Sequence, residues 1–444
     1  MAVHVCDALC GAGKTSAAIN MMNKEVDAKF IFVTQYIAEA ERIQKACPAK
    51  NFVLPEADYE QKQTKLNDIK HMLQSGANIA TTHALFVSFT DKIKDIIQSQ
   101  EYILVLDEVV QTIKDAEVSK NDFEILQRSG TVECNGELVE WMNDEYKEGR
   151  YMDEMNFARS HNLLCRDGGW FYWALPPELF YCFKDVYILT YMFQYQDMRY
   201  FFDTHEITYD LIGTHRGVNG YQFCPAEEMD RRRDLRDKVH ILDHKKLNSV
   251  GSGNRTALSS TWYKRELGGA YDGEEICGGE QIEQLRKNLN NLYKNIYKAK
   301  ADEFLWTTFK RARSVLSGKG YVNSFLPCVM RASNEYANRR YLAYCVNTFP
   351  SPSDVKYYRG HGISLDGDMY ALSTLVQWLF RSAIRNNEEI WIYIPSIRMR
   401  TLLTKWLDNL AEGNDLEPVS YTTPRKSYYT PKKKRTNKTT KTHQ

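Results

Sequence analysis

The stretch that decides the fold is Ala8-Leu9-Cys10-Gly11-Ala12-Gly13-Lys14-Thr15. It follows a short strand-like run, Ala2 to Asp7, and precedes a helical pattern from Ser16 to Asn23. Its spacing is that of a phosphate-binding loop, with Ala8 where the strict pattern has glycine. In such a loop the glycines let backbone N–H groups converge on phosphate oxygens, the lysine reaches the β and γ phosphates, and the threonine hydroxyl faces Mg²⁺. The alternative interpretation is a chance Gly-Lys-Thr turn. We expect instead an ATP and Mg²⁺ site formed by Ala8, Gly11, Ala12, Gly13, Lys14 and Thr15.

An acidic pair, Asp107-Glu108, ends the apolar run Tyr102 to Leu106. Ligands of open parallel sheets bind at the carboxyl ends of the strands, so Asp107 is suited to hold Mg²⁺ and Glu108 to polarise the attacking water. Such a pair alone marks only a strand end. Together with the phosphate loop, it predicts an ATP-hydrolysing enzyme.

Apolar runs separated by helical patterns recur along the first 204 residues. Further runs lie at Phe30 to Val33, Asn78 to Thr81 and Val186 to Thr190. Strands spaced by helices predict a parallel sheet that is covered on both faces. Between about 113 and 180 this rhythm breaks, and the turn signals Asn135-Gly136 and Asp167-Gly168-Gly169 predict an inserted β-hairpin element.

Residues 205 to 421 predict a second α/β domain, since 444 residues exceed what one hydrophobic core usually organises. We expect strands at Tyr221 to Cys224, Lys238 to Leu242, Tyr341 to Val346 and Ile390 to Ile394. We expect helices at Glu280 to Ala299 and Met369 to Arg385.

The charge of the chain is unevenly distributed. It has 58 basic and 57 acidic residues; eight of the basic ones and none of the acidic ones follow residue 421, so the rest carries −7. Residues 422 to 444 lack apolar periodicity, which predicts a disordered basic tail, either a solvated arm or one with salt-sensitive affinity for DNA. No run approaches the roughly 20 apolar residues of a membrane span and no signal peptide is recognisable, so we expect a cytoplasmic protein without a membrane partner.

On these motifs the chain resembles the superfamily 2 helicases of the DEAD/DEAH-like group, and in particular compact phage-encoded DNA helicases, over most of residues 1 to 415. Asp107-Glu108-Val109-Val110 is similar to the family's DExx box, and Ile188-Leu189-Thr190-Tyr191 occupies the place of the motif that couples ATP state to DNA. The resemblance implies two RecA-like domains, 1–204 and 205–421, with ATP between them and nucleic acid across both.

The resemblance also implies nucleic-acid contacts. They are Thr34, Thr82 and His83 at strand ends and Arg331 and Asn334 in the second domain. For His83, a hydrogen bond to a backbone carbonyl is an equally good interpretation. The aromatic cluster Trp170 to Trp173 is suited either to stacking on bases or to core packing.

The segment Gln377 to Arg385 resembles the family's arginine motif, with Phe380 where the family has glycine. Gln377, Arg381 and Arg385 recur every four residues, which places them on one stripe of a predicted helix. A surface carboxylate would make the stripe structural. The functional interpretation makes all three catalytic, with the arginines neutralising charge on the γ-phosphate from the second domain.

The sequence therefore predicts an ATP-dependent DNA helicase or translocase of replication or recombination, located in the bacterial host cell if phage-encoded. DNA is favoured over RNA, and replication or recombination proteins are candidate partners. Two alternatives stay open: an ATPase that remodels nucleoprotein without unwinding, and a nucleotide-regulated DNA-binding protein with little turnover. A packaging motor with an attached nuclease is disfavoured, because the sequence has no convincing carboxylate cluster for two metals.

Overall fold

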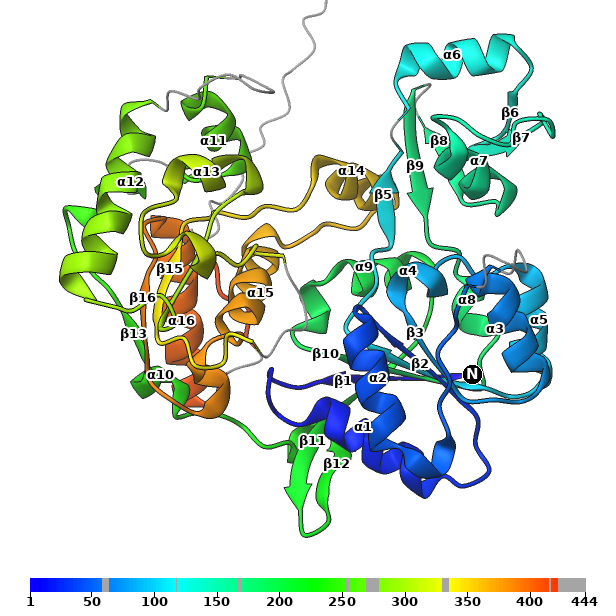
Figure 1. Ribbon diagram of the computed structural model, residues 1–444, viewed down its shortest axis with the longest axis horizontal. Helices are drawn as coiled ribbons and strands as arrows, with labels where there is room; N and C mark the ends of the chain where they lie inside the picture. Colours follow the sequence, from blue (N-terminus) through cyan, green and yellow to red (C-terminus); the bar gives the residue numbers. More distant parts are fainter. Residues whose placement is uncertain are drawn as a thin grey trace, which may run out of the picture.

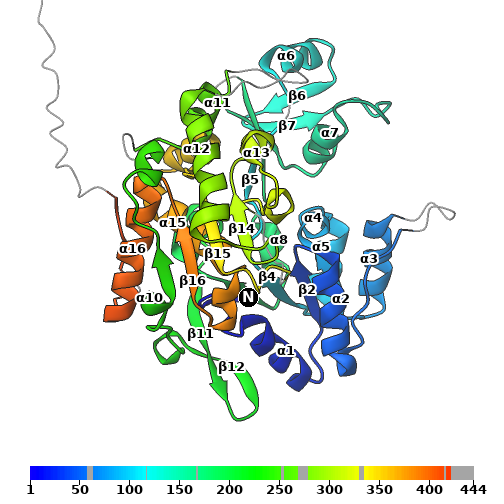
Figure 2. The same ribbon diagram turned by 60° about the vertical axis from the view of Figure 1, so that its left-hand side comes forward.

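The computed structural model describes residues 1–57, 64–116, 118–166, 169–251, 255–268, 279–329, 335–414 and 417–421. Arg331, Asn334 and the basic tail from 422 onward lie outside these residues. Two α/β domains stand side by side, with a smaller unit above the first (Figure 1), and the turned view shows the three units packed together (Figure 2). No helix in the described part is long and apolar enough to cross a membrane.

The first domain is built on a sheet that has seven strands within the described residues. In spatial order they are β12 (Gly220–Pro225), β11 (Asp210–Gly217), β1 (Ala2–Asp7), β10 (Asp185–Thr190), β4 (Ile103–Asp107), β2 (Phe30–Thr34) and β3 (Ile79–Thr82). All neighbours are parallel except β11 and β12, which form an antiparallel hairpin. The parallel sheet predicted from the alternating runs is therefore present.

Strand β2 shows why both faces of this sheet are covered. Phe30 and Phe32 pack into one core and Ile31 and Val33 into another, as the alternation of a strand requires. The first face is covered by α1 (Lys14–Lys24) and α2 (Ile37–Ala46). The second is covered by α3 (Lys65–Gln74), α4 (His83–Phe86), α5 (Asp91–Ser99), α8 (Glu178–Tyr181) and α9 (Asp197–Thr204).

The inserted unit is a five-stranded antiparallel sheet within the described residues, with two helices. Its strands, in spatial order, are β5 (Ile113–Asp115), β9 (Trp170–Ala174), β8 (Leu163–Arg166), β7 (Leu138–Trp141) and β6 (Val132–Asn135), with helices α6 (Lys120–Arg128) and α7 (Met152–Arg159). Strands β6 and β7 pair across the Asn-Gly signal. Phe171, Tyr172 and Trp173 of β9 are buried, so core packing is the correct interpretation for these aromatic residues.

The second domain has its own four-stranded parallel sheet within the described residues. Its strands, in spatial order, are β13 (Val239–Ile241), β16 (Ile390–Tyr393), β15 (Tyr341–Tyr344) and β14 (Phe304–Thr307). One face packs on α11 (Ser260–Glu266), α12 (Glu280–Asn291) and α13 (Arg313–Leu316). The other packs on α10 (Leu235–Lys238), α15 (Gly367–Leu379) and α16 (Ile397–Glu412).

Two boundaries differ from the prediction. The strand expected at Tyr221 to Cys224 forms, but it belongs with β11 to the first sheet, so the first domain extends beyond residue 204. The helix expected to reach Arg385 ends at Leu379 and gives way to a 3-10 turn at Ala383–Asn386. The backbone at Ser382 is extended, with φ −88° and ψ −173°, so the helical conformation cannot continue through it. The regular helical stripe of Gln377, Arg381 and Arg385 is therefore wrong.

Helix α14 (Pro352–Gly360) lies between β15 and α15 in the sequence but packs on the first domain (Figure 1). The Tyr358 hydroxyl donates to Asp197 O at 2.9 Å and lies 2.8 Å from Thr112 Oγ1. Lys356 Nζ lies 4.5 Å from the centroid of the Trp170 ring in the insertion. Helix α14 thus ties the second domain to both the first domain and the inserted unit.

Candidate active site

The predicted phosphate loop, residues 8–15, connects β1 to α1. Gly11 and Gly13 have φ values of +85° and +80°, a left-handed conformation that glycine adopts without strain. Ala8 has no such φ, and its N–H donates to Thr190 O at 3.2 Å, which explains why alanine is tolerated there. Lys14 is buried, and its Nζ donates to Ala8 O at 2.6 Å and Leu9 O at 3.2 Å. The Lys14 amine is therefore hydrogen-bonded to the backbone of the loop and does not extend into solvent.

A hydroxyl and a carboxylate meet where a magnesium ion is expected. The Thr15 hydroxyl donates to Asp107 Oδ1 at 3.3 Å, which joins the first turn of α1 to the end of β4. Burial, and after it the charge of Glu108, raise the pKa of Asp107 to about 7, although the nearby Lys14 acts to lower it. Mg²⁺ prefers such oxygen ligands and binds the ionised carboxylate. The pair therefore fits the ion.

Glu108 is held in an unusual backbone conformation. Its φ is +68°, in the left-handed region that is strained for a residue with a side chain. Its N–H donates to Leu189 O at 2.9 Å, and its Oε2 lies 3.4 Å from Thr190 Oγ1. The Thr190 hydroxyl also lies 2.9 Å from Gln196 Oε1. The carboxyl end of β10 therefore positions this carboxylate beside the predicted metal site.

Asp7 is a site residue that sequence reasoning missed. It ends β1, and its carboxylate accepts hydrogen bonds from Met192 N at 2.7 Å and Phe193 N at 3.0 Å. Burial raises its pKa to about 6, against these bonds and the nearby Lys14, which lower it. An aspartate directly before the loop was the available signal. Its role is to fix the segment after β10 against the phosphate loop.

Two arginines reach the loop from the second domain. The charges of Lys14, Glu108, Arg381 and Arg385 all act on the thiol of Cys10, so these side chains lie in its neighbourhood. A Cβ built on Gly11 would lie 3.7 Å from Arg385 Cγ. The loss of the regular helix has therefore not separated the two arginines, because the turn after α15 brings both to the loop.

Within the described part of the chain, no carboxylate forms a salt bridge with either arginine. Among the described residues neither forms an ion pair, and Arg381, which is buried, has its Nε without a hydrogen-bond partner. The pKa of Arg385 is lowered, first by burial and then by repulsion from Arg381. Gln377 stays on α15, half-buried, with no hydrogen bond to the loop in the described part of the chain. The two arginines, rather than the full triplet, are placed to receive an anion.

The residues expected to touch nucleic acid lie at the carboxyl ends of β2 and β3. Thr34 is buried with its hydroxyl unpaired, and Thr82 is half-buried at the end of β3. His83 Nε2 lies 3.0 Å from Asp107 O, the backbone contact that was the alternative interpretation. The corresponding edge of the second sheet has a buried, unpaired hydroxyl that sequence reasoning missed, that of Thr307 at the end of β14.

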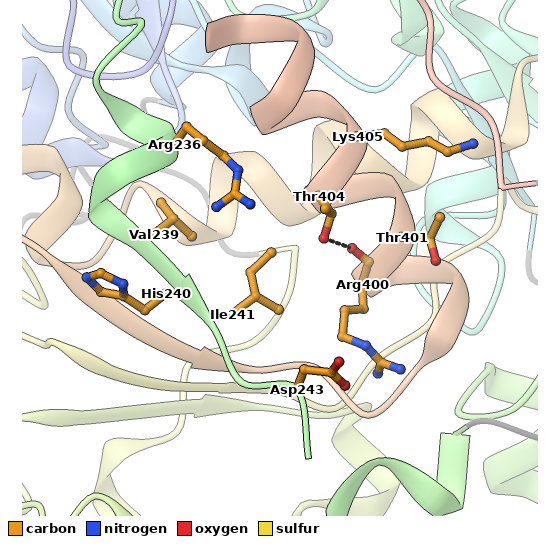
Figure 3. Close-up of a pocket in the computed structure, with 9 residues that line it drawn as sticks. All are labelled: Arg236, Val239, His240, Ile241, Asp243, Arg400, Thr401, Thr404 and Lys405. Atoms are coloured by element: carbon orange, nitrogen blue, oxygen red, sulfur yellow. Dashed lines mark hydrogen bonds between the residues drawn. The ribbon is translucent and has the colours of Figure 1, made fainter. Parts of the chain in front are cut away.

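A separate pocket of about 530 Å³ lies between the edge strand β13 and α16 (Figure 3). Its cationic groups are already engaged, since Arg236 pairs with Asp408 at 2.7 Å and Arg400 donates to Ile394 O at 2.7 Å. It shares no lining residue with the phosphate loop. The ATP site expected from the sequence is therefore not this pocket.

The chain matches two family profiles: "YonV middle domain" over residues 113–173 and "YonV C-terminal Rossmann-like domain" over residues 233–407. The first match coincides with the inserted unit, and the second begins after the β11–β12 hairpin. The chain is 36% identical over 420 residues to the SPbeta prophage-derived uncharacterized protein YonV of Bacillus subtilis (strain 168), covering 92% of this chain and 99% of that protein.

Two solved structures show a distant likeness. The structure of S. tokodaii Xpd4 matches with a TM-score of 0.44 and 11% identity, covering 93% of each chain. A hypothetical ATP-dependent RNA helicase from Sulfolobus tokodaii matches with a TM-score of 0.25 and 9% identity, covering 88% of this chain and 86% of that one. Likeness at these scores does not establish a shared activity.

Proposed function

The chain belongs to the YonV family, and we propose that it is a magnesium-dependent ATP hydrolase that moves along or unwinds nucleic acid. One observation carries the proposal: a phosphate loop, a Thr15–Asp107 pair and two second-domain arginines, Arg381 and Arg385, meet around one point. The first two features are those of an ATP-binding site. Arg381 and Arg385 belong to the second domain, so they would contact a nucleotide that is bound between the two domains.

Each residue has a separate role in hydrolysis. Lys14 and the N–H groups of Gly11, Gly13 and Thr15 bind the phosphates, while Thr15 and Asp107 would hold Mg²⁺, which would neutralise phosphate charge. Glu108 orients the attacking water and accepts its proton. Arg381 and Arg385 stabilise the negative charge that develops during transfer of the γ-phosphoryl group.

The arrangement of the domains gives this chemistry a mechanical outcome. Because the arginines come from the second domain, hydrolysis requires that domain to lie against the loop, and release of phosphate removes the anion that holds it there. Threonine hydroxyls lie at the carboxyl ends of both sheets, Thr34 on β2 and Thr307 on β14, and hydroxyls are among the groups that bind a phosphate backbone. A strand held by both domains would be gripped differently in the two states, which gives stepwise movement.

The test is hydrolysis and strand separation by the full-length chain. ATP turnover is measured without nucleic acid, with single-stranded DNA and with single-stranded RNA, and strand displacement is measured on 3′-tailed, 5′-tailed and blunt duplexes. The proposal expects faster hydrolysis with nucleic acid and displacement of at least one tailed duplex. Stimulation without displacement would favour an ATPase that remodels nucleoprotein. Hydrolysis that no nucleic acid changes would contradict the motor, and absence of hydrolysis would leave a nucleotide-regulated binding protein.

A further inference from the structure

The β11–β12 hairpin is packed directly against the phosphate loop. The Thr214 hydroxyl donates to Ala12 O at 2.7 Å, and Asn20 Nδ2 of α1 donates to Tyr221 O at 3.2 Å. The Tyr221 ring lies so close to Gly13 that a Cβ built there would be 2.2 Å from Tyr221 Cγ. Contact this close excludes any side chain at Gly13, so the loop and the hairpin form one surface.

Strand order shows which part of a nucleotide faces this surface. The metal-binding end of the site lies on β4, which is separated from β1 by β10. The hairpin lies on the opposite side of β1. A triphosphate with its γ-phosphate beside Asp107 and Glu108 and its other phosphates along the loop leaves its sugar and base on the hairpin side.

The side chains of the hairpin suit the face of a base. Tyr221 is only partly buried, and the guanidinium carbon of Arg216, its cross-strand partner, lies 5.9 Å from the centroid of its ring. Aromatic rings and guanidinium planes are the groups on which bases stack. Arg216 is exposed, so its guanidinium group lies at the surface of the hairpin. Its backbone N–H donates to Asp230.

We propose that Tyr221, supported by Arg216, forms the platform for the base of the bound nucleoside triphosphate. This inference rests on the proposed function, because it places the base relative to the phosphate loop. It makes Tyr221 a residue that distinguishes a nucleotide from a bare polyphosphate. A hairpin outside both matched family segments thereby completes the nucleotide site.

The test compares ATP with inorganic tripolyphosphate, which has the phosphates but no base. Binding of each, with Mg²⁺, is measured by calorimetry to the parent chain and to Tyr221→Ala, Tyr221→Phe, Lys14→Ala and Val218→Ala. Val218 is fully exposed at the turn of the same hairpin and serves as the matched control. We expect Tyr221→Ala to weaken ATP by about tenfold, the loss of one stacked base, and to leave tripolyphosphate unchanged. Tyr221→Phe and Val218→Ala should bind both ligands like the parent.

Two results would overturn the inference while leaving the ATPase proposal standing. Equal weakening of both ligands by Tyr221→Ala would show that the ring only shapes the loop at Gly13, and unchanged binding of both would show that the base lies elsewhere. A parent chain that binds neither ligand would instead refute the proposed function, and this inference with it. Lys14→Ala should weaken both ligands, which identifies the phosphate loop as their common site.

Discussion

The Thr15 hydroxyl lies 3.3 Å from Asp107 Oδ1, although 92 residues separate the two in the chain. Folding brings them together because β1 and β4 are parallel strands of one sheet that end at the same edge. The contact joins a helix to a buried carboxyl whose pKa is raised to about 7. This combination makes the site sensitive to pH even before a ligand binds.

We predict that Asp107 makes the metal-free protein less stable as pH rises. The unfolded chain releases this proton near 3.8, whereas the folded chain holds it to about 7, so its stabilising contribution is complete below about 4 and is lost between the two values. Denaturant titrations at a series of pH values measure this. Asp107→Asn, which has no proton to lose, should have a higher free energy of unfolding than the parent at pH 8. An equal pH dependence in both proteins would contradict the burial argument.

Glu108→Gln should bind ATP like the parent but hydrolyse it about 10²-fold or more slowly, because an amide cannot accept the proton of the attacking water. Single-turnover hydrolysis beside a nucleotide-binding measurement separates these effects. Glu101→Gln is the matched control, since Glu101 is exposed at the other end of β4. Normal hydrolysis by Glu108→Gln would mean that another residue serves as the base.

Arg381→Ala and Arg385→Ala should each keep most of the affinity for ATP and lose about 10³-fold in nucleic-acid-stimulated turnover, the effect of an arginine that acts on transition-state charge. Gln377→Ala should lose less, since Gln377 stays on α15. Arg340→Ala, which removes an exposed partner of Glu388 in the same domain, is the control. Full stimulated rates in both arginine variants would show that the site is confined to the first domain.

Tyr358→Phe should lower the free energy of unfolding by about 1–3 kcal/mol, because it leaves Asp197 O and the Thr112 hydroxyl without their buried partner. Urea denaturation of the parent and the variant measures the loss. Tyr181→Phe also removes a hydroxyl bonded to a backbone carbonyl, but an exposed one, and should change stability little. Equal stability of Tyr358→Phe and the parent would show that α14 does not tie the domains together through this hydroxyl.

The sequence predicts most of the phosphate site because a loop between a strand and a helix is a local feature. Gly11, Gly13, Lys14 and Thr15 are fixed by their own short stretch, and Asp107 by the end of one apolar run. The membership of the β11–β12 hairpin in the first sheet depends on pairing with β1, some two hundred residues away, and no local pattern encodes it. The same holds for α14, whose tyrosines enter the core of the other domain.

For Arg381 and Arg385, the predicted helix is wrong, but both residues still lie near the loop between β1 and α1. The predicted helix ends early because the backbone becomes extended at Ser382. Arg385 nevertheless approaches Gly11, since the turn that replaces the helix packs its apolar residues, Phe380 and Ala383, into the core of the second domain. The predicted helix and the observed turn can therefore both bring the two arginine side chains to the same ligand.

The most direct test of the central claim is phosphate release from ATP and Mg²⁺ by the parent chain, Lys14→Ala and Lys24→Ala, measured in parallel with circular dichroism. Lys14 is buried across the loop, whereas Lys24 is exposed at the other end of the same helix. We predict that the parent and Lys24→Ala hydrolyse ATP at similar rates, and that Lys14→Ala is folded but inactive. A folded Lys14→Ala protein that releases phosphate at the parent rate would contradict the assignment of this loop as the ATP site.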